Sequence, residues 1–150
     1  MKKKLLLLLL LLICFSLSGC KRTVKSYDDM KEIIYRSIFT QNANTYYVYF
    51  YRPYVSDANH CPACERVKDS IIDYANYNLH PIYLININNK KINEGMMLSC
   101  DDCENIALNA KVYTDIKIAY VPYLILIQNG VVTKTFGGVS EIKAELTLNN

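Results

Sequence analysis

Two cysteines in a C-x-x-C pair, Cys61 and Cys64, lie between an aromatic run at 46–51 and a helical pattern at 65–77. Cysteines at this spacing can close a small disulfide. At the start of a helix, aligned amide dipoles and free N–H groups stabilise the thiolate that attacks disulfides. The spacing also occurs in zinc sites. Between a strand and a helix, however, it predicts a redox-active pair in which Cys61 is the nucleophile and Cys64 the resolving thiol.

A second C-x-x-C pair, Cys100 and Cys103, leaves three interpretations open. The favoured one is a structural or regulatory disulfide within the pair. Alternatively, this pair exchanges electrons with Cys61 and Cys64, or all four cysteines together bind Zn²⁺. Zinc ranks last because the separation of Cys64 from Cys100 exceeds the usual zinc-ribbon spacing. The expected redox group is therefore a disulfide without a cofactor.

The N-terminal segment has the pattern of a signal peptide. Lysines at 2–4 precede an apolar run at 5–17, which is too short to span a bilayer comfortably. The run ends in Leu17-Ser18-Gly19-Cys20, which resembles the lipobox of bacterial lipoproteins. The resemblance implies cleavage before Cys20 and a diacylglyceryl group on its sulfur, so that the protein is attached to the cell membrane outside the cytoplasm.

The chain is therefore expected to have three parts: a signal peptide at 1–19, the lipidated Cys20 with a tether up to 25, and one domain at 26–150 with an insert at about 88–103. Lysine and arginine number 17 against 14 acidic residues, and three lysines lie in the signal, so the mature chain has 17 − 3 = 14 of each and is formally neutral. This balance argues against a nucleic-acid partner and against a polybasic membrane patch.

Hydrophobic periodicity predicts the order α-β-α-β-α-β-β-α. The expected helices and strands are at about 27–40, 46–51, 65–77, 82–87, 104–113, 123–127, 131–136 and 140–148. The helical crossover makes the first two strands parallel, and Asn129-Gly130 joins the last two as a hairpin. We expect an α/β fold with a mixed sheet and helices on both faces.

This order, with C-x-x-C after the first strand and Pro122 before the third, resembles the thioredoxin fold over 26–150. The segment at 119–130 is similar to the part of that family in which a cis-proline begins a strand. The resemblance implies a cis Val121–Pro122 bond opposite Cys61, with the peptide before the proline docking the substrate chain. It also implies protein thiols and disulfides as partners, together with a membrane or extracytoplasmic electron partner.

The sequence departs from thioredoxins at several positions. Their Trp before the first cysteine is His60 here, and their Gly-Pro between the cysteines is Pro62-Ala63. The buried Asp of cytoplasmic thioredoxins corresponds most closely to Tyr49. We therefore expect an extracytoplasmic thiol-disulfide oxidoreductase, in which His60 either modulates the Cys61 thiolate or is a solvated loop residue. The alternative functions are a non-catalytic binding or accessory module and a zinc-binding domain.

Overall fold

The computed structural model describes residues 23–54, 56, 60–77, 80–89, 95–98 and 103–148. The predictions that concern the signal peptide, Cys20 and Cys100 lie outside these residues. Among the described residues, no helix is both long enough and apolar enough to cross a membrane.

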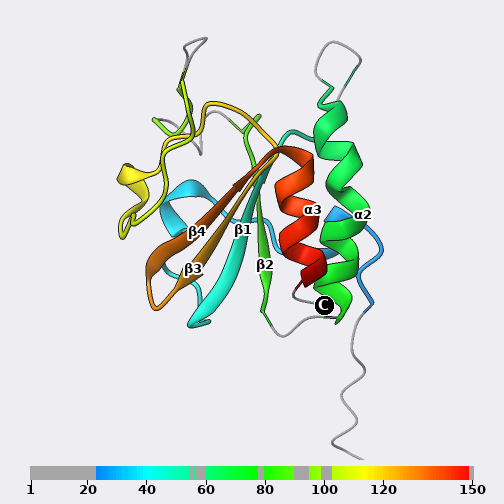
Figure 1. The fold of residues 1–150 in the computed structure, drawn as a ribbon, viewed down its shortest axis with the longest axis horizontal. Helices are drawn as coiled ribbons and strands as arrows, with labels where there is room; N and C mark the ends of the chain where they lie inside the picture. The colour runs from blue at the N-terminus through cyan, green and yellow to red at the C-terminus, as the bar shows by residue number, and fades with distance from the viewer. Residues whose placement is uncertain are drawn as a thin grey trace, which may run out of the picture.

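The fold is built on a four-stranded mixed sheet with the strand order β2-β1-β3-β4 (Figure 1). The strands are β1 Thr45–Tyr51, β2 Ile82–Asn86, β3 Tyr123–Gln128 and β4 Val131–Gly137. β1 is parallel to β2, while β3 is antiparallel to both β1 and β4. The predicted parallel pair and the predicted hairpin are both confirmed.

Two α-helices, α2 Pro62–Tyr77 and α3 Gly138–Leu148, lie side by side on one face of the sheet (Figure 1). Alternate residues of β1 point to this face because side chains in a strand alternate between its two sides. Tyr47, Tyr49 and Tyr51 therefore join the α2 and α3 side chains in one buried cluster, which also contains Cys61 and Cys64. The central strand thus packs directly beneath the cysteine pair.

The opposite face of the sheet is covered by short 3₁₀-helices and irregular chain. Tyr46, Val48 and Phe50 of β1 point to this side. The 3₁₀-helix η2 Tyr35–Ser37 contributes Tyr35 to the same buried cluster as these side chains, and η4 Tyr113–Asp115 packs against it through Tyr113. The predicted fold class is confirmed, but the helices of this second face are 3₁₀-helices instead of α-helices.

The predicted α-helix at 27–40 is wrong. Two 3₁₀-helices, η1 Tyr27–Asp29 and η2, flank an extended segment in which Glu32 pairs with Leu84 of β2. The Ile33 N–H donates to the Leu84 carbonyl at 2.8 Å, and the Leu84 N–H donates to the Lys31 carbonyl at 3.0 Å. The edge of β2 offers backbone groups that need partners, so pairing there takes precedence over the local helical spacing.

The predicted α-helix at 104–113 is also wrong. Ile106 forms an antiparallel bridge with Lys117, with two backbone hydrogen bonds of 2.8 and 2.7 Å. Beyond it, the Asn109 N–H donates to the Val132 carbonyl at 2.9 Å, which attaches the segment to β4. The described part of the predicted insert joins the same layer, since Met96 is fully buried and Met97 pairs with Ile118. Contacts distant in sequence therefore replace the helical hydrogen bonds.

Candidate active site

The cysteine pair lies at the N-terminus of α2. Cys61 and Cys64 form a disulfide, with their Cα atoms 5.3 Å apart. The Glu65 N–H donates to the Cys61 carbonyl at 3.2 Å, which makes Cys61 the residue immediately before the helix. Pro62 begins the helix, a position that suits proline because its missing N–H would have no helical partner there.

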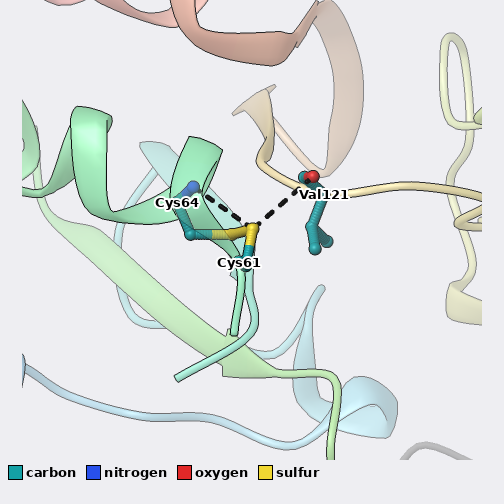
Figure 2. The surroundings of a disulfide bond; sticks show 3 residues. All are labelled: Cys61, Cys64 and Val121. Carbon is teal, nitrogen blue, oxygen red and sulfur yellow. Dashed lines mark hydrogen bonds between the residues drawn. A yellow bond between two sulfur atoms is a disulfide. The ribbon is translucent and has the colours of Figure 1, made fainter. Parts of the chain in front are cut away.

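Exposure and hydrogen bonding distinguish the two sulfurs. Cys61 is 9 % exposed and Cys64 only 1 %. The Cys64 N–H donates to the Cys61 Sγ at 3.2 Å (Figure 2). After reduction, this N–H and the N-terminal end of the helix dipole both stabilise a thiolate on Cys61. The arrangement therefore suits attack by Cys61 and resolution by the more buried Cys64.

Val121 faces this disulfide from the loop before β3. Its carbonyl oxygen lies 3.9 Å from the Cys61 Sγ (Figure 2). The Val121–Pro122 bond is cis, as the resemblance to thioredoxins implied. On the far side of the proline, the Gly138 N–H at the start of α3 donates to the Pro122 carbonyl at 3.0 Å. Residues distant in sequence thus form two opposing walls of one site.

Asn105 belongs to this region, and the sequence analysis did not identify it. Its side-chain oxygen accepts hydrogen bonds from the Ala119 N–H at 2.6 Å and the Tyr120 N–H at 3.1 Å. Its amide nitrogen donates to the Tyr120 carbonyl at 3.2 Å. The available sequence signal was an asparagine inside an expected helix, because asparagine favours side-chain bonds to the backbone over helical geometry.

His60 is exposed and packs against an aromatic neighbour. Its ring meets that of Tyr54 edge to face, with the centroids 5.2 Å apart. Tyr54 also lines a cavity of about 210 Å³ beside the start of α2, to which Tyr27, Glu65 and Lys68 contribute. His60 precedes Cys61 in the sequence, and the structure places its ring against Tyr54.

Tyr49, at the position compared with the buried Asp of thioredoxins, is fully buried in the same cluster as Cys64. Burial raises the pKa of its hydroxyl well above the usual value, and the interaction with the Tyr27 side chain, which lowers this pKa, does not offset the effect of burial. Tyr49 is therefore a neutral phenol at physiological pH and does not take the place of a carboxylate base.

Cys103 is disulfide-bonded. Because Cys61 and Cys64 are bonded to each other, the partner of Cys103 lies outside the described residues. The predicted Cys100–Cys103 bond and the electron relay between the pairs stay predictions. In the described part of the chain, no group of three or more His, Cys, Asp or Glu side chains has the arrangement of a metal site.

No protein-family model matches the sequence, and no curated protein matches it either. Solved structures do match the fold. A mutant thioredoxin from Halobacterium salinarum NRC-1 is 16 % identical, with a TM-score of 0.51 over 83 % of this chain and 91 % of that one. The oxidised mitochondrial thioredoxin 3 from Saccharomyces cerevisiae is 14 % identical, with a TM-score of 0.51 over 81 % of this chain and 94 % of that one.

These similarities, together with the sheet order, define a thioredoxin-like fold. Within that fold the chain carries a Cys61–Cys64 disulfide at the N-terminus of a helix.

Proposed function

We propose that the protein is a membrane-anchored, extracytoplasmic thiol-disulfide oxidoreductase that acts on protein substrates through Cys61 and Cys64. The observation that carries the proposal is the position of the Cys61 Sγ. It accepts the Cys64 N–H at the start of α2 and lies 3.9 Å from the Val121 carbonyl oxygen. The thioredoxin-like fold of the neighbours supports it.

In the reducing direction, the Cys61 thiolate attacks one sulfur of a substrate disulfide. The Cys61–substrate bond forms, the substrate disulfide breaks, and the other substrate sulfur leaves as a thiolate. Cys64 then loses its proton and attacks the Cys61 Sγ, which closes the Cys61–Cys64 disulfide and releases the second substrate sulfur. Two electrons pass from the dithiol to the substrate, and the oxidising direction is the reverse.

The burial of Cys64 controls the second step. Because Cys64 is 1 % exposed, external disulfides have little access to it, while it remains within bonding distance of Cys61. Its proton is passed to water or to a departing substrate thiolate, since the neighbouring Tyr49 is a neutral phenol. The incoming substrate chain lies against the main chain of Val121, on the opposite wall.

The location rests on the sequence. The Leu17-Ser18-Gly19-Cys20 segment supports cleavage and lipid attachment at Cys20. In bacteria fed a labelled fatty acid, we expect the wild-type protein to carry label in the membrane fraction. The Cys20→Ser variant should carry none, and label retained on that variant would contradict lipidation at this residue.

The activity is tested by insulin reduction with dithiothreitol as electron donor, using the full chain in detergent. We expect the wild-type protein to accelerate insulin precipitation and Cys61→Ser to give the rate of dithiothreitol alone. Lys111→Ala, an exposed change in the loop before η4, is the control and should retain wild-type activity. Equal rates for the wild-type protein and Cys61→Ser would show that the domain is a binding or accessory module.

A further inference from the structure

The Asn105 side chain binds the backbone of Tyr120, immediately before Val121, whose carbonyl oxygen faces the Cys61 Sγ. Asn105 contacts both ends of Tyr120: it accepts the Tyr120 N–H at 3.1 Å and donates to the Tyr120 carbonyl at 3.2 Å. It also accepts the Ala119 N–H at 2.6 Å. This set requires a donor and an acceptor on one short side chain, which asparagine provides and aspartate does not.

Asn105 is itself held in place by its neighbour in the chain. Ile106 exchanges two backbone hydrogen bonds with Lys117, of 2.8 and 2.7 Å. Lys117 lies two residues before Ala119, so the segment that carries Asn105 and the segment that it binds are joined in a fixed register. The side chain therefore acts from a defined position and not from a free loop.

The bond to the Tyr120 carbonyl fixes the direction of the Val121 N–H. The two groups belong to one planar trans peptide unit and point in opposite directions. Holding the carbonyl of Tyr120 therefore sets the orientation of the amide of Val121, the residue whose own carbonyl oxygen lies 3.9 Å from the Cys61 Sγ. On the other side of the wall, the Gly138 N–H holds the Pro122 carbonyl.

We propose that Asn105 is a positioning residue that orients the main chain of Val121 for pairing with an extended segment of a protein substrate opposite Cys61. This inference rests on the proposed function. Asn105 makes its hydrogen bonds to the main chain of the loop, so its effect on the reaction passes through Val121. Small thiols do not pair with a protein main chain, so the rate at which they reduce the Cys61–Cys64 disulfide should not depend on Asn105.

The experiment compares two reactions of the full chain in detergent. The first is insulin reduction, with kcat and KM measured separately. The second is reduction of the Cys61–Cys64 disulfide by dithiothreitol alone. We expect Asn105→Ala to raise the KM for insulin about fivefold to tenfold, the effect of losing roughly one good docking hydrogen bond, and to leave the dithiothreitol rate unchanged. Asn42→Ala, an exposed asparagine before β1, is the matched control and should behave as wild type.

Asn105→Asp separates the hydrogen bonds that the Asn105 side chain accepts from the one that it donates. It keeps an acceptor for the Ala119 and Tyr120 N–H groups, but it replaces the donor to the Tyr120 carbonyl with a repelling oxygen. We expect its KM to rise as in Asn105→Ala. Because it retains two bonds, it also provides a folded variant if Asn105→Ala unfolds.

Two results would overturn the inference while the proposed function stands: a wild-type KM in either Asn105 variant, or an equal loss in the insulin and dithiothreitol reactions. The last result would mean that Asn105 acts on the fold or on Cys61 itself. A wild-type protein that fails to reduce insulin would overturn the proposed function, and this inference with it.

Discussion

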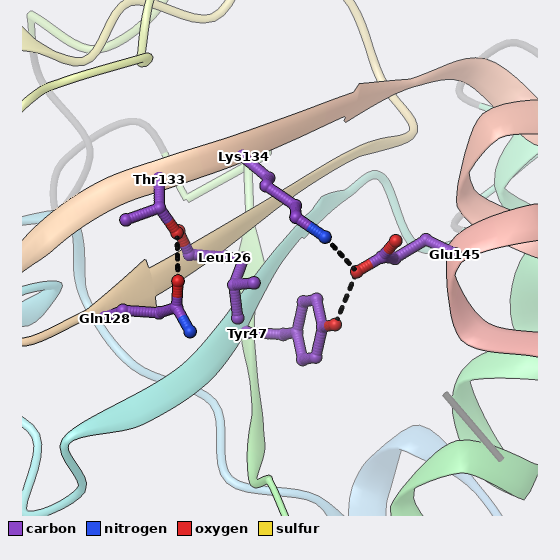
Figure 3. Close-up of polar contacts among 6 residues, drawn as sticks. All are labelled: Tyr47, Leu126, Gln128, Thr133, Lys134 and Glu145. Atoms are coloured by element: carbon purple, nitrogen blue, oxygen red, sulfur yellow. Dashed lines mark hydrogen bonds and ion pairs between the residues drawn. The ribbon is translucent and has the colours of Figure 1, made fainter. Parts of the chain in front are cut away.

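The Tyr47 hydroxyl donates a hydrogen bond of 2.8 Å to the Glu145 carboxylate, which connects the central strand β1 to α3 (Figure 3). The Lys134 ammonium of β4 lies 3.9 Å from the same oxygen. Glu145 is 8 % exposed, and a carboxylate so removed from water depends on such partners. The link also bears on the site, because α3 begins at Gly138, which holds the Pro122 carbonyl.

Removal of the Tyr47 hydroxyl should therefore destabilise the fold. We expect Tyr47→Phe to lower the free energy of unfolding by about 1–3 kcal/mol, the usual cost of losing a buried hydrogen bond to a charged group. Urea denaturation at neutral pH measures it. Thr133→Val is the control. It removes the exposed hydrogen bond of 2.8 Å from the Thr133 hydroxyl of β4 to the Gln128 side chain of β3, together with a long one of 3.4 Å to the Leu126 carbonyl, and should cost less than about 0.5 kcal/mol (Figure 3). Equal losses in the two variants would contradict a buried role for the Tyr47–Glu145 bond.

The two active-site thiols should differ in reactivity. In the reduced, folded protein, we expect iodoacetamide to modify Cys61 well before Cys64, because Cys61 is more exposed and its sulfur accepts the Cys64 N–H. Peptide mapping after short labelling times measures the order. In urea the difference should disappear. Faster labelling of Cys64 in the folded state would reverse the assignment of nucleophile and resolving thiol.

Gly137 leaves space for Tyr120, which precedes the Val121 wall. A Cβ added at Gly137 would lie 2.6 Å from the Tyr120 hydroxyl oxygen, closer than real contacts allow. Tyr120 is 47 % exposed, so its ring can move aside. We therefore expect Gly137→Ala to lose about 1 kcal/mol or less of stability, within the common range for point changes.

The Tyr120 hydroxyl oxygen is the atom that would lie closest to a Cβ at Gly137. We therefore expect the loss caused by Gly137→Ala to shrink when Tyr120→Phe is also present, in a double-mutant cycle measured by urea denaturation. Additive effects of the two changes would mean that the hydroxyl does not limit the space at Gly137.

The buried tyrosines predict a loss of stability in alkali. Burial is the main cause that raises the pKa of eight described tyrosines: Tyr27, Tyr35, Tyr46, Tyr47, Tyr49, Tyr51, Tyr74 and Tyr123. The pKa of Tyr35 and of Tyr46 rises to about 12. Below the unfolded pKa of about 10 both states are protonated, and ionisation contributes no pH dependence.

Above that pH the unfolded state releases protons that the folded state retains, so stability falls as pH rises. The slope is about 1.4 kcal/mol per pH unit for each tyrosine that is ionised only when unfolded. For Tyr35 and Tyr46 the loss continues up to their folded pKa of about 12. Urea denaturation at pH 8 to 11, combined with phenolate absorbance, measures the effect. A constant free energy of unfolding over this range would contradict it.

The sequence was sufficient to predict the strands, the parallel pair β1–β2 and the hairpin β3–β4, but not the antiparallel pairing of β1 with β3. The strand at 46–51 is apolar on both faces, and Asn129-Gly130 marks the hairpin, so local pattern and tertiary structure agree in β1, β3 and β4. It also placed the cysteine pair at the start of a helix and Pro122 immediately before a strand, because both elements are strongly patterned.

The segments at 27–40 and 104–113 were mispredicted for a common reason. Their apolar residues have helical spacing, but their backbones are bound to distant chain, at Leu84 in one case and at Lys117 in the other. Pairing with a strand or segment far along the sequence leaves no local signal. Asn105 was missed because its partners, Ala119 and Tyr120, are distant in the sequence, and an asparagine inside an expected helix does not by itself name them.

The most direct test of the central claim is to trap the mixed disulfide. Cys64→Ser removes the resolving thiol, so the Cys61–substrate bond formed in the first step should persist. We predict that this variant, reduced at Cys61 and mixed with native insulin whose disulfides are intact, accumulates an adduct. Mass spectrometry should assign the adduct to Cys61, and dithiothreitol should reverse it. No adduct, or an adduct located at Cys103 with Cys61 unmodified, would contradict the account.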